Sequence, residues 1–157
     1  PVTHEKGVFD AAVLKEGQDV EKVGVKKGVD CVYKKKLMQP LVVGAIESVE
    51  RMEEYGVSGF PDYEGNGASA GKYSNFIINE LLPYVKKQSG VRKFNSISFA
   101  GCSLGALSAL AISWDNADKM DKVGMLSGSF GFREKEETDP GYSGGSPGNL
   151  HERQPHE

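Results

Sequence analysis

The residues with the clearest chemical potential form the sequence Gly101-Cys102-Ser103-Leu104-Gly105. A β-prone run precedes this G-x-S-x-G pattern, and a helix-prone run rich in small residues follows it. The arrangement is typical of a nucleophile elbow, in which a serine on a strained strand-to-helix turn exposes its hydroxyl. The sequence therefore predicts that Ser103 is a nucleophile for acyl transfer. The alternative is an ordinary strand-to-helix turn with an incidental serine, because a G-x-S-x-G pattern alone is a weak signal in a glycine-rich chain.

Acyl transfer also requires hydrogen-bond donors for the oxyanion of the tetrahedral intermediate. The backbone N–H of Leu104 would supply one donor, because it stands at the start of the predicted helix, where the helix dipole adds positive charge. The second donor is expected from the loop after an earlier strand. In this sequence that loop lies around Gly17 and Gln18.

A serine nucleophile further needs a general base, usually a histidine oriented by an acid. The chain order nucleophile, acid, histidine leaves His151 and His156 of the three histidines, the other being His4. By the same order, Asp139 is the best-placed acid. We therefore take His151 and Asp139 as candidates for the base and the acid. Both lie in a polar stretch with no apolar strand before it, so a solvated histidine and a turn aspartate are the competing interpretations.

Strand-like and helix-like patterns alternate along the chain before that polar stretch. Strands are expected at 11–14, 40–46, 96–100 and 123–127, and helices at 20–36, 73–87 and 104–114. The run 40–46 lacks alternation and suits a parallel strand covered on both faces. A long polar connection spans 47–71, and Pro83 should kink or shorten its helix. The pattern predicts an α/β domain: a mostly parallel sheet of about four strands with helices on both faces.

The composition of the 157-residue chain excludes several classes of protein. Apolar residues make up 38% and charged residues 26%, with a net charge of −3, as in an ordinary soluble domain. No basic surplus points to nucleic acid, no apolar run is long enough to span a membrane, and no motif predicts a cofactor or a metal. Two cysteines make no disulfide framework, and we expect Cys102 to be a buried free thiol. The domain is expected at 1–132, followed by an irregular tail at 133–157.

Six segments of the chain carry a recognisable pattern in this order: 13–18, 39–45, 51–55, 76–84, 100–106 and 126–130. Together they resemble the esterase branch of the α/β-hydrolase superfamily, which includes esterase D-like and enterochelin-esterase-like proteins. The resemblance covers residues from about 12 to 132. It implies a partial α/β-hydrolase fold, Ser103 as nucleophile, and ester or thioester substrates. Family members continue with two more strands that carry the acid and the histidine, so either this chain is a piece that ends after the sixth strand of the fold or the protein has lost the full triad.

The predicted function is that of a serine esterase acting through a Ser103 acyl-enzyme on a small-molecule or carbohydrate ester. We expect reduced activity for this chain, because neither the acid nor the histidine is evident. Two alternatives stay open: a non-catalytic binding module on a hydrolase fold, and acyl transfer to an alcohol by the same serine. An exposed edge strand would favour a homo-oligomer. The sequence fits a soluble protein of the cytoplasm, the periplasm or the extracellular space, and a leader before Pro1 could have been removed.

Overall fold

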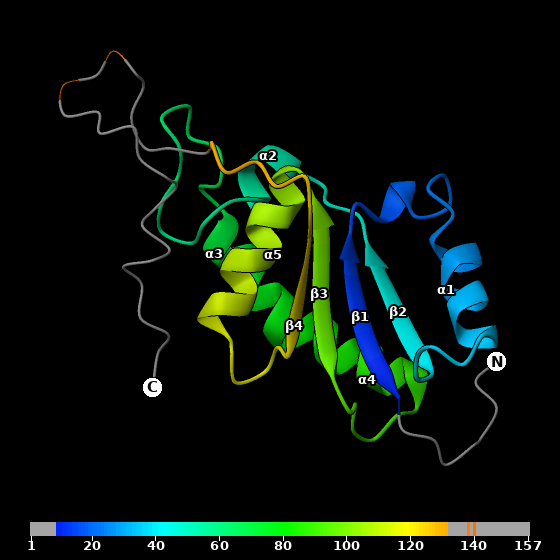
Figure 1. Cartoon of the computed structure of the whole chain (residues 1–157). Helices are drawn as coiled ribbons and strands as arrows, with labels where there is room; N and C mark the ends of the chain where they lie inside the picture. The colour runs from blue at the N-terminus through cyan, green and yellow to red at the C-terminus, as the bar shows by residue number, and fades with distance from the viewer. Residues whose placement is uncertain (1–8, 132–137, 139, 141–157) are drawn as a thin grey trace.

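The computed structural model describes residues 9–131 together with residues 138 and 140, and its centre is a parallel sheet (Figure 1). Within these residues, four strands pair in the order β2-β1-β3-β4. All three pairings are parallel, and the register places Val13 opposite Gly44 on one side and Phe99 on the other. The predicted α/β fold with a parallel sheet is therefore confirmed. The strands are β1 (Asp10–Lys15), β2 (Leu41–Ile46), β3 (Ile97–Cys102) and β4 (Lys122–Leu126).

Helices connect the strands as crossovers. The β1–β2 crossover runs across the sheet in the opposite direction from the β2–β3 and β3–β4 crossovers. Because such connections are right-handed, α1 belongs on one face of the sheet and the later helices on the other. Figure 1 shows α1 apart from the others, beside β2. The helices are η1 (Gly17–Asp19, a 3₁₀ turn), α1 (Val25–Lys34), α2 (Arg51–Glu54), α3 (Ala70–Phe76), η2 (Ile77–Leu81, a π turn), α4 (Leu82–Ser89) and α5 (Leu104–Asp115).

The hydrophobic core lies between the sheet and the layer formed by α3, η2, α4 and α5. Alternate residues of β1 are buried against this layer, as the two-residue period of a strand requires. Helix α5 is buried at nine of its twelve positions, which explains why its sequence is apolar nearly all round. No residue of α1 is buried. The core is thus one-sided, and its fully buried members include Val13, Tyr55, Val57, Ile77, Phe99 and Leu107.

Pro83 does not end its helix, so the shortening that the sequence suggested as one of two effects is wrong. Proline lacks an N–H, and its ring collides with the carbonyl one turn back in a regular α-helix. The chain avoids this conflict with the π turn Ile77–Leu81, after which Pro83 occupies one of the first positions of α4. A missing N–H costs little there. The helical path is therefore continuous from Ala70 to Ser89.

Three other expectations about elements need correction. Helix α1 begins at Val25 instead of residue 20, because Gly24 precedes it in the left-handed conformation with φ of 69°. Strand β2 is an edge of the described sheet and is not covered on both faces, and Val43 is exposed. The connection 47–71 is more than a polar loop: it contains α2 and supplies Tyr55 and Val57 to the core. A long loop can therefore carry core residues at isolated positions that no periodicity reveals.

The predicted tail at 133–157 lies outside the described residues, apart from residues 138 and 140. Across the part of the chain that is described, no helix is both long enough and apolar enough to cross a membrane.

Candidate active site

Ser103 stands at the junction of β3 and α5, at the carboxyl end of the sheet. Its backbone has φ of 55° and ψ of −125°, a combination that is strained for a residue with a side chain. The turn is tight because Gly101 lies against the first turn of α5, where a Cβ would be 2.4 Å from the carbonyl oxygen of Gly105. The strand, turn and helix predicted for the elbow are all present.

The segment after β4 is bonded to this turn through the backbone. The N–H of Ser103 donates to the carbonyl oxygen of Leu126 at 3.0 Å, and the N–H of Ser129 donates to the carbonyl oxygen of Ser103 at 3.1 Å. The two serine hydroxyl oxygens are 2.9 Å apart and share a hydrogen bond. Sequence reasoning assigned no role to Ser129. A signal existed, because Ser129 follows the carboxyl end of the strand that pairs with β3, where the side chains of a parallel sheet's active site gather.

Leu104 opens α5, so its N–H belongs to the first turn, whose N–H groups have no intrahelical acceptor. Gly17 begins η1 directly after β1, and only glycine fits there, since a Cβ would lie 2.8 Å from the backbone carbon of Ile46. The Gln18 side chain donates to the Glu16 carboxylate at 3.0 Å. Both predicted donor regions therefore lie at the carboxyl ends of adjacent strands, although Gly17 and Gln18 do not line the pocket described below. Their oxyanion role stays a prediction.

An ion pair fixes the loop after β1. Arg51 of α2 donates from Nε to the Glu16 carboxylate at 2.9 Å. Glu16 has φ of 63°, a left-handed conformation that turns the chain sharply out of β1. The Glu16 carboxylate also lies against the elbow, 3.4 Å from where a Cβ on Gly105 would be. Arg51 and Glu16 thereby connect three segments that surround Ser103.

Lys15 is buried directly behind the site, with only 4% of its surface exposed. Its Nζ donates to the hydroxyl of Ser108 on α5 and lies 3.8 Å from the Tyr55 ring centroid and 4.4 Å from that of Tyr73. Burial holds the pKa of the Lys15 ammonium well below its ordinary value of 10.5, while Glu16 and Glu54 oppose this effect. Burial also raises the pKa values of both tyrosines.

Ser103 lines a pocket of about 570 Å³ between the carboxyl end of the sheet and the η1–α1 segment. Its wall is mainly apolar, and charged side chains, including Glu16, Lys22 and Arg51, also reach it. A mainly apolar pocket with a few polar groups and one candidate nucleophile is the usual form of a small-molecule site. The apolar lining residues are Leu14, Val20, Val23, Val25, Ala100 and Leu126.

Cys102 is exposed, so the expectation of a buried thiol is wrong. The reason is the alternation of β3: Phe99 and Gly101 face the buried helix layer, and Cys102 faces the opposite side of the sheet. On that side Cys102 contributes to the pocket wall. Cys31 is also exposed, and both thiols are free, as predicted from the cysteine count.

The predicted base His151 and acid Asp139 lie outside the described residues, as do His4 and His156. The structure therefore leaves these predictions untested. Among the residues that it does describe, no three His, Cys, Asp or Glu side chains gather in a way that could hold a metal ion.

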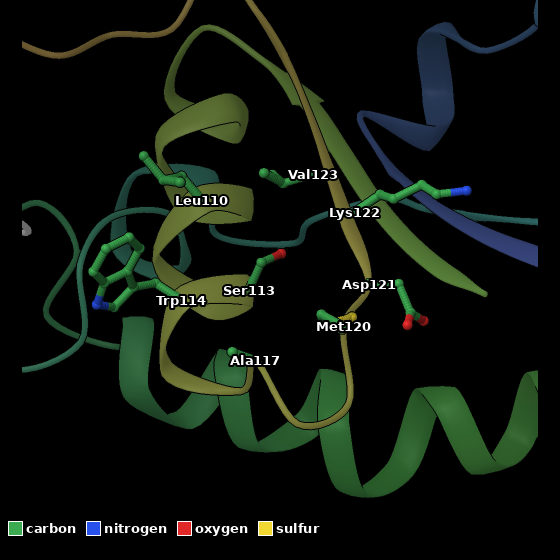
Figure 2. Close-up of a pocket in the computed structure, with 8 residues that line it drawn as sticks. All are labelled: Leu110, Ser113, Trp114, Ala117, Met120, Asp121, Lys122 and Val123. Carbon is green, nitrogen blue, oxygen red and sulfur yellow. The ribbon is translucent and has the colours of Figure 1, made fainter. Parts of the chain in front are cut away.

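A second, smaller pocket of about 250 Å³ lies at the other end of α5 (Figure 2). The side chains of Leu110, Trp114, Met120 and Val123 contribute to its mostly apolar lining. Since a helix rises about 1.5 Å per residue, Trp114 lies about 15 Å along α5 from the elbow. This pocket is separate from the Ser103 site.

A family model described as "Putative esterase" matches residues 5–139. The chain belongs to this esterase family. The match spans the elbow, the loop after β1 and the segment that carries Ser129. It agrees with the resemblance seen in the sequence.

Solved structures support the same fold. The enterochelin esterase from Shigella flexneri is 21% identical, with a TM-score of 0.68, over 88% of this chain and 34% of that protein. The enterobactin esterase from Shigella flexneri, solved in the presence of enterobactin, is 24% identical, with a TM-score of 0.62, over 83% of this chain and 31% of that protein. A ferulic acid esterase is 20% identical, with a TM-score of 0.59, over 87% of this chain and 52% of that protein.

The chain therefore spans about a third of the length of the first two proteins and about half of the third. A search of curated proteins finds no match.

Proposed function

We propose that this chain carries the nucleophile of an esterase site and that Ser103 attacks the carbonyl carbon of an ester. The observation that carries the proposal is the strained backbone of Ser103, with φ of 55°, at a turn that opens onto a pocket of about 570 Å³. Strain of this kind persists where the surroundings enforce it, and it is common at catalytic residues. Here it puts a hydroxyl at the amino end of α5, beside the N–H groups of the first helical turn.

The reaction follows from this placement. A general base takes the proton from Ser103 Oγ while a bond forms between Oγ and the ester carbonyl carbon. The carbonyl oxygen becomes an oxyanion, for which the N–H of Leu104 and the loop at Gly17 and Gln18 are the proposed donors. The bond to the alcohol oxygen then breaks, and the alcohol leaves with a proton. Water hydrolyses the resulting acyl-enzyme and restores the serine.

His151 and Asp139 are the proposed base and acid, on the strength of chain order alone. If neither reaches Ser103, the serine keeps its ordinary low reactivity and hydrolysis is slow. Turnover below that of ordinary esterases is therefore expected for this chain.

The proposed substrate is a small-molecule or carbohydrate ester. The apolar wall of the pocket suits the hydrocarbon part of an acyl group, and Lys22 and Arg51 could contact polar substituents. Similarity to an enterobactin esterase and to a ferulic acid esterase supports this substrate class.

The test is hydrolysis of a short-chain p-nitrophenyl ester by the wild-type chain, Ser103→Ala and Ser113→Ala. Ser113 is a matched control, because it is a buried serine near the far end of α5, the helix that follows Ser103, and it lines the smaller pocket there. Hydrolysis above background that Ser103→Ala abolishes and Ser113→Ala retains would support the proposal. Equal rates for the wild-type chain and Ser103→Ala would refute it. A Ser103-dependent rate near that of ordinary esterases would favour His151 or His156 as a base within the chain.

A further inference from the structure

We propose that Ser129 is a hydrogen-bond donor to the nucleophile, which holds the Ser103 hydroxyl in position and stabilises negative charge on its oxygen during attack. This inference rests on the proposed function of Ser103. It adds a residue to the site that neither the elbow pattern nor the order nucleophile, acid, histidine contains.

The side chains of Ser103 and Ser129 are in direct contact. The hydroxyl oxygens of Ser103 and Ser129 are 2.9 Å apart, a normal distance for an O–H···O hydrogen bond. Both residues are half-buried. Partial exclusion of water strengthens such a bond and makes its loss costly.

Backbone hydrogen bonds on both sides hold the two serines together. Ser103 donates its N–H to Leu126, and Ser129 donates its N–H to Ser103, so the elbow and the turn after β4 are bonded in both directions. Within the turn, Ser127 takes a left-handed conformation with φ of 48°, and the N–H of Phe130 donates to the carbonyl oxygen of Gly128. A tight turn fixed in this way leaves Ser129 little freedom, so its contact with the nucleophile is preorganised.

The chemistry of the attack sets the direction of the hydrogen bond between the two hydroxyls. A serine hydroxyl has one proton and two acceptor positions. Ser103 must give its proton to the general base, so in the reactive arrangement it accepts from Ser129 through another lone pair. The Ser129 proton stays on Ser129 throughout, and no net transfer occurs between the two serines. Hydrogen bonds to a charged oxygen are about twice as strong as neutral ones, so this bond strengthens as Ser103 loses its proton.

A thiol in place of the nucleophile measures this effect without requiring esterase activity. The parent protein carries Ser103→Cys together with Cys31→Ser and Cys102→Ala, which remove the two exposed native thiols. The rate of alkylation by iodoacetamide as a function of pH then gives the pKa of the introduced thiol. Lys15, Glu16, Asp19, Lys22 and Arg51 also line the pocket and are unchanged in every variant, so differences report on Ser129.

Adding Ser129→Ala to this parent should raise the thiol pKa and lower the thiolate fraction at neutral pH by about 3- to 10-fold. Ser129→Thr, which retains a hydroxyl, should preserve the parent value. Ser129→Val has the shape of threonine without its hydroxyl and should behave like Ser129→Ala. Equal thiol pKa values in the threonine and valine variants would overturn the proposal, and circular dichroism confirms that the compared proteins are folded.

The native nucleophile provides the second readout. With Ser103 present, Ser129→Ala and Ser129→Val should lower kcat for a p-nitrophenyl ester by about 3- to 10-fold with little change in KM, and Ser129→Thr should retain kcat. If the wild-type chain shows no Ser103-dependent hydrolysis, this result would count against the proposed function, while the thiol measurement would still decide the role of Ser129. Ser103-dependent hydrolysis with unchanged thiol pKa values would reject the role of Ser129 alone.

Discussion

Lys15 shows how one residue connects the core to the candidate site. It is the last residue of β1, and its ammonium group lies among aromatic rings, where it bonds to Ser108 on the helix that begins at the nucleophile. Cation–π contacts and one hydrogen bond offset part of the cost of burying its charge. The lowered pKa of Lys15 indicates that they do not offset all of it.

Because the cost of burying the Lys15 charge is not fully offset, the free energy of unfolding should depend on pH. Because the folded-state pKa of Lys15 lies below the unfolded value of 10.5, the unfolded chain binds more protons between these two pKa values. The free energy of unfolding should therefore rise with pH across that window, by up to about 1.4 kcal/mol per pH unit. The Lys15→Met variant, which keeps apolar contact with the rings, should lack this rise.

Urea unfolding of both proteins from pH 6 to pH 9 provides the measurement. This range stays below the ordinary tyrosine pKa of 10.0, above which the raised pKa values of Tyr55 and Tyr73 would lower stability. Glu16, Glu54 and Arg51, the charged groups that act on Lys15, are present in both proteins. Parallel stability curves for the wild-type chain and Lys15→Met would show that Lys15 titrates alike in the folded and unfolded states.

The residues that sequence reasoning identified are those with a local pattern. Ser103 and Leu104 follow from the elbow, because strand, turn and helix are adjacent in the chain. The partners of Lys15 come from three separate segments, so no local pattern brings Tyr55, Tyr73 and Ser108 together. The exposure of Cys102 depends on which face of the sheet is covered, and a strand's own sequence does not specify this.

At the scale of elements, the elbow depends on close contact between the end of β3 and the start of α5. Gly101→Ala should destabilise the fold by about 1–3 kcal/mol, because the new Cβ would lie 2.4 Å from a backbone oxygen that cannot move without opening the turn. Reactivity at Ser103 should fall as well, since relaxing the turn would move its hydroxyl. Thermal unfolding and ester hydrolysis measure the two effects.

Gly105→Ala is the matched control for that change. Its Cβ would meet the carboxylate end of Glu16 at 3.4 Å, an ordinary contact, and alanine favours helix over glycine by about 0.5–1 kcal/mol. Stability should therefore be unchanged or slightly higher. Equal losses in Gly101→Ala and Gly105→Ala would mean that the close approach at Gly101 does not shape the elbow.

Sequence periodicity predicted the type and order of the main elements, but not all of their boundaries. The four strands lie close to where apolar runs placed them. The start of α1 shifted to Val25 because Gly24 adopts a left-handed conformation. Pro83 does not shorten its helix because a π turn accommodates the lost hydrogen bond, and such a turn leaves no simple sequence pattern.

At the scale of the whole molecule, the sheet has a covered face and a more open one. On the more open side, Val43 of β2, Leu126 of β4 and Val32 of α1 are exposed. Strand β2 is an edge of the described sheet, and unprotected edges favour pairing between chains. We therefore expect the chain to self-associate through this edge as its concentration rises.

Val43→Lys should reduce this association, because an edge lysine opposes strand pairing. Val32→Lys makes the same change at an exposed position of helix α1, whose backbone does not pair with a strand, and should reduce association less. Sedimentation velocity over a range of protein concentrations compares the self-association of the two variants with that of the wild-type chain. A wild-type chain that stays monomeric throughout, or equal effects of both substitutions, would contradict pairing through β2.

The α/β architecture was predictable from alternating patterns, and the fold agrees with the similarity to solved esterase structures. Which face of the sheet is covered by helices could not be predicted from the sequence, because this depends on the packing of several helices and not on any single element. The parallel sheet, the strained elbow and the pocket beside it nevertheless converge on one claim, that Ser103 is a nucleophile.

The most direct test of that claim is covalent labelling with a fluorophosphonate, followed by mass spectrometry of the intact chain and its peptides. Attack by Ser103 forms a bond from Oγ to phosphorus and releases fluoride. We expect one adduct per chain on the peptide that contains Ser103, lost in Ser103→Ala and retained in Ser113→Ala. An unlabelled wild-type chain, or equal labelling of Ser103→Ala, would contradict it.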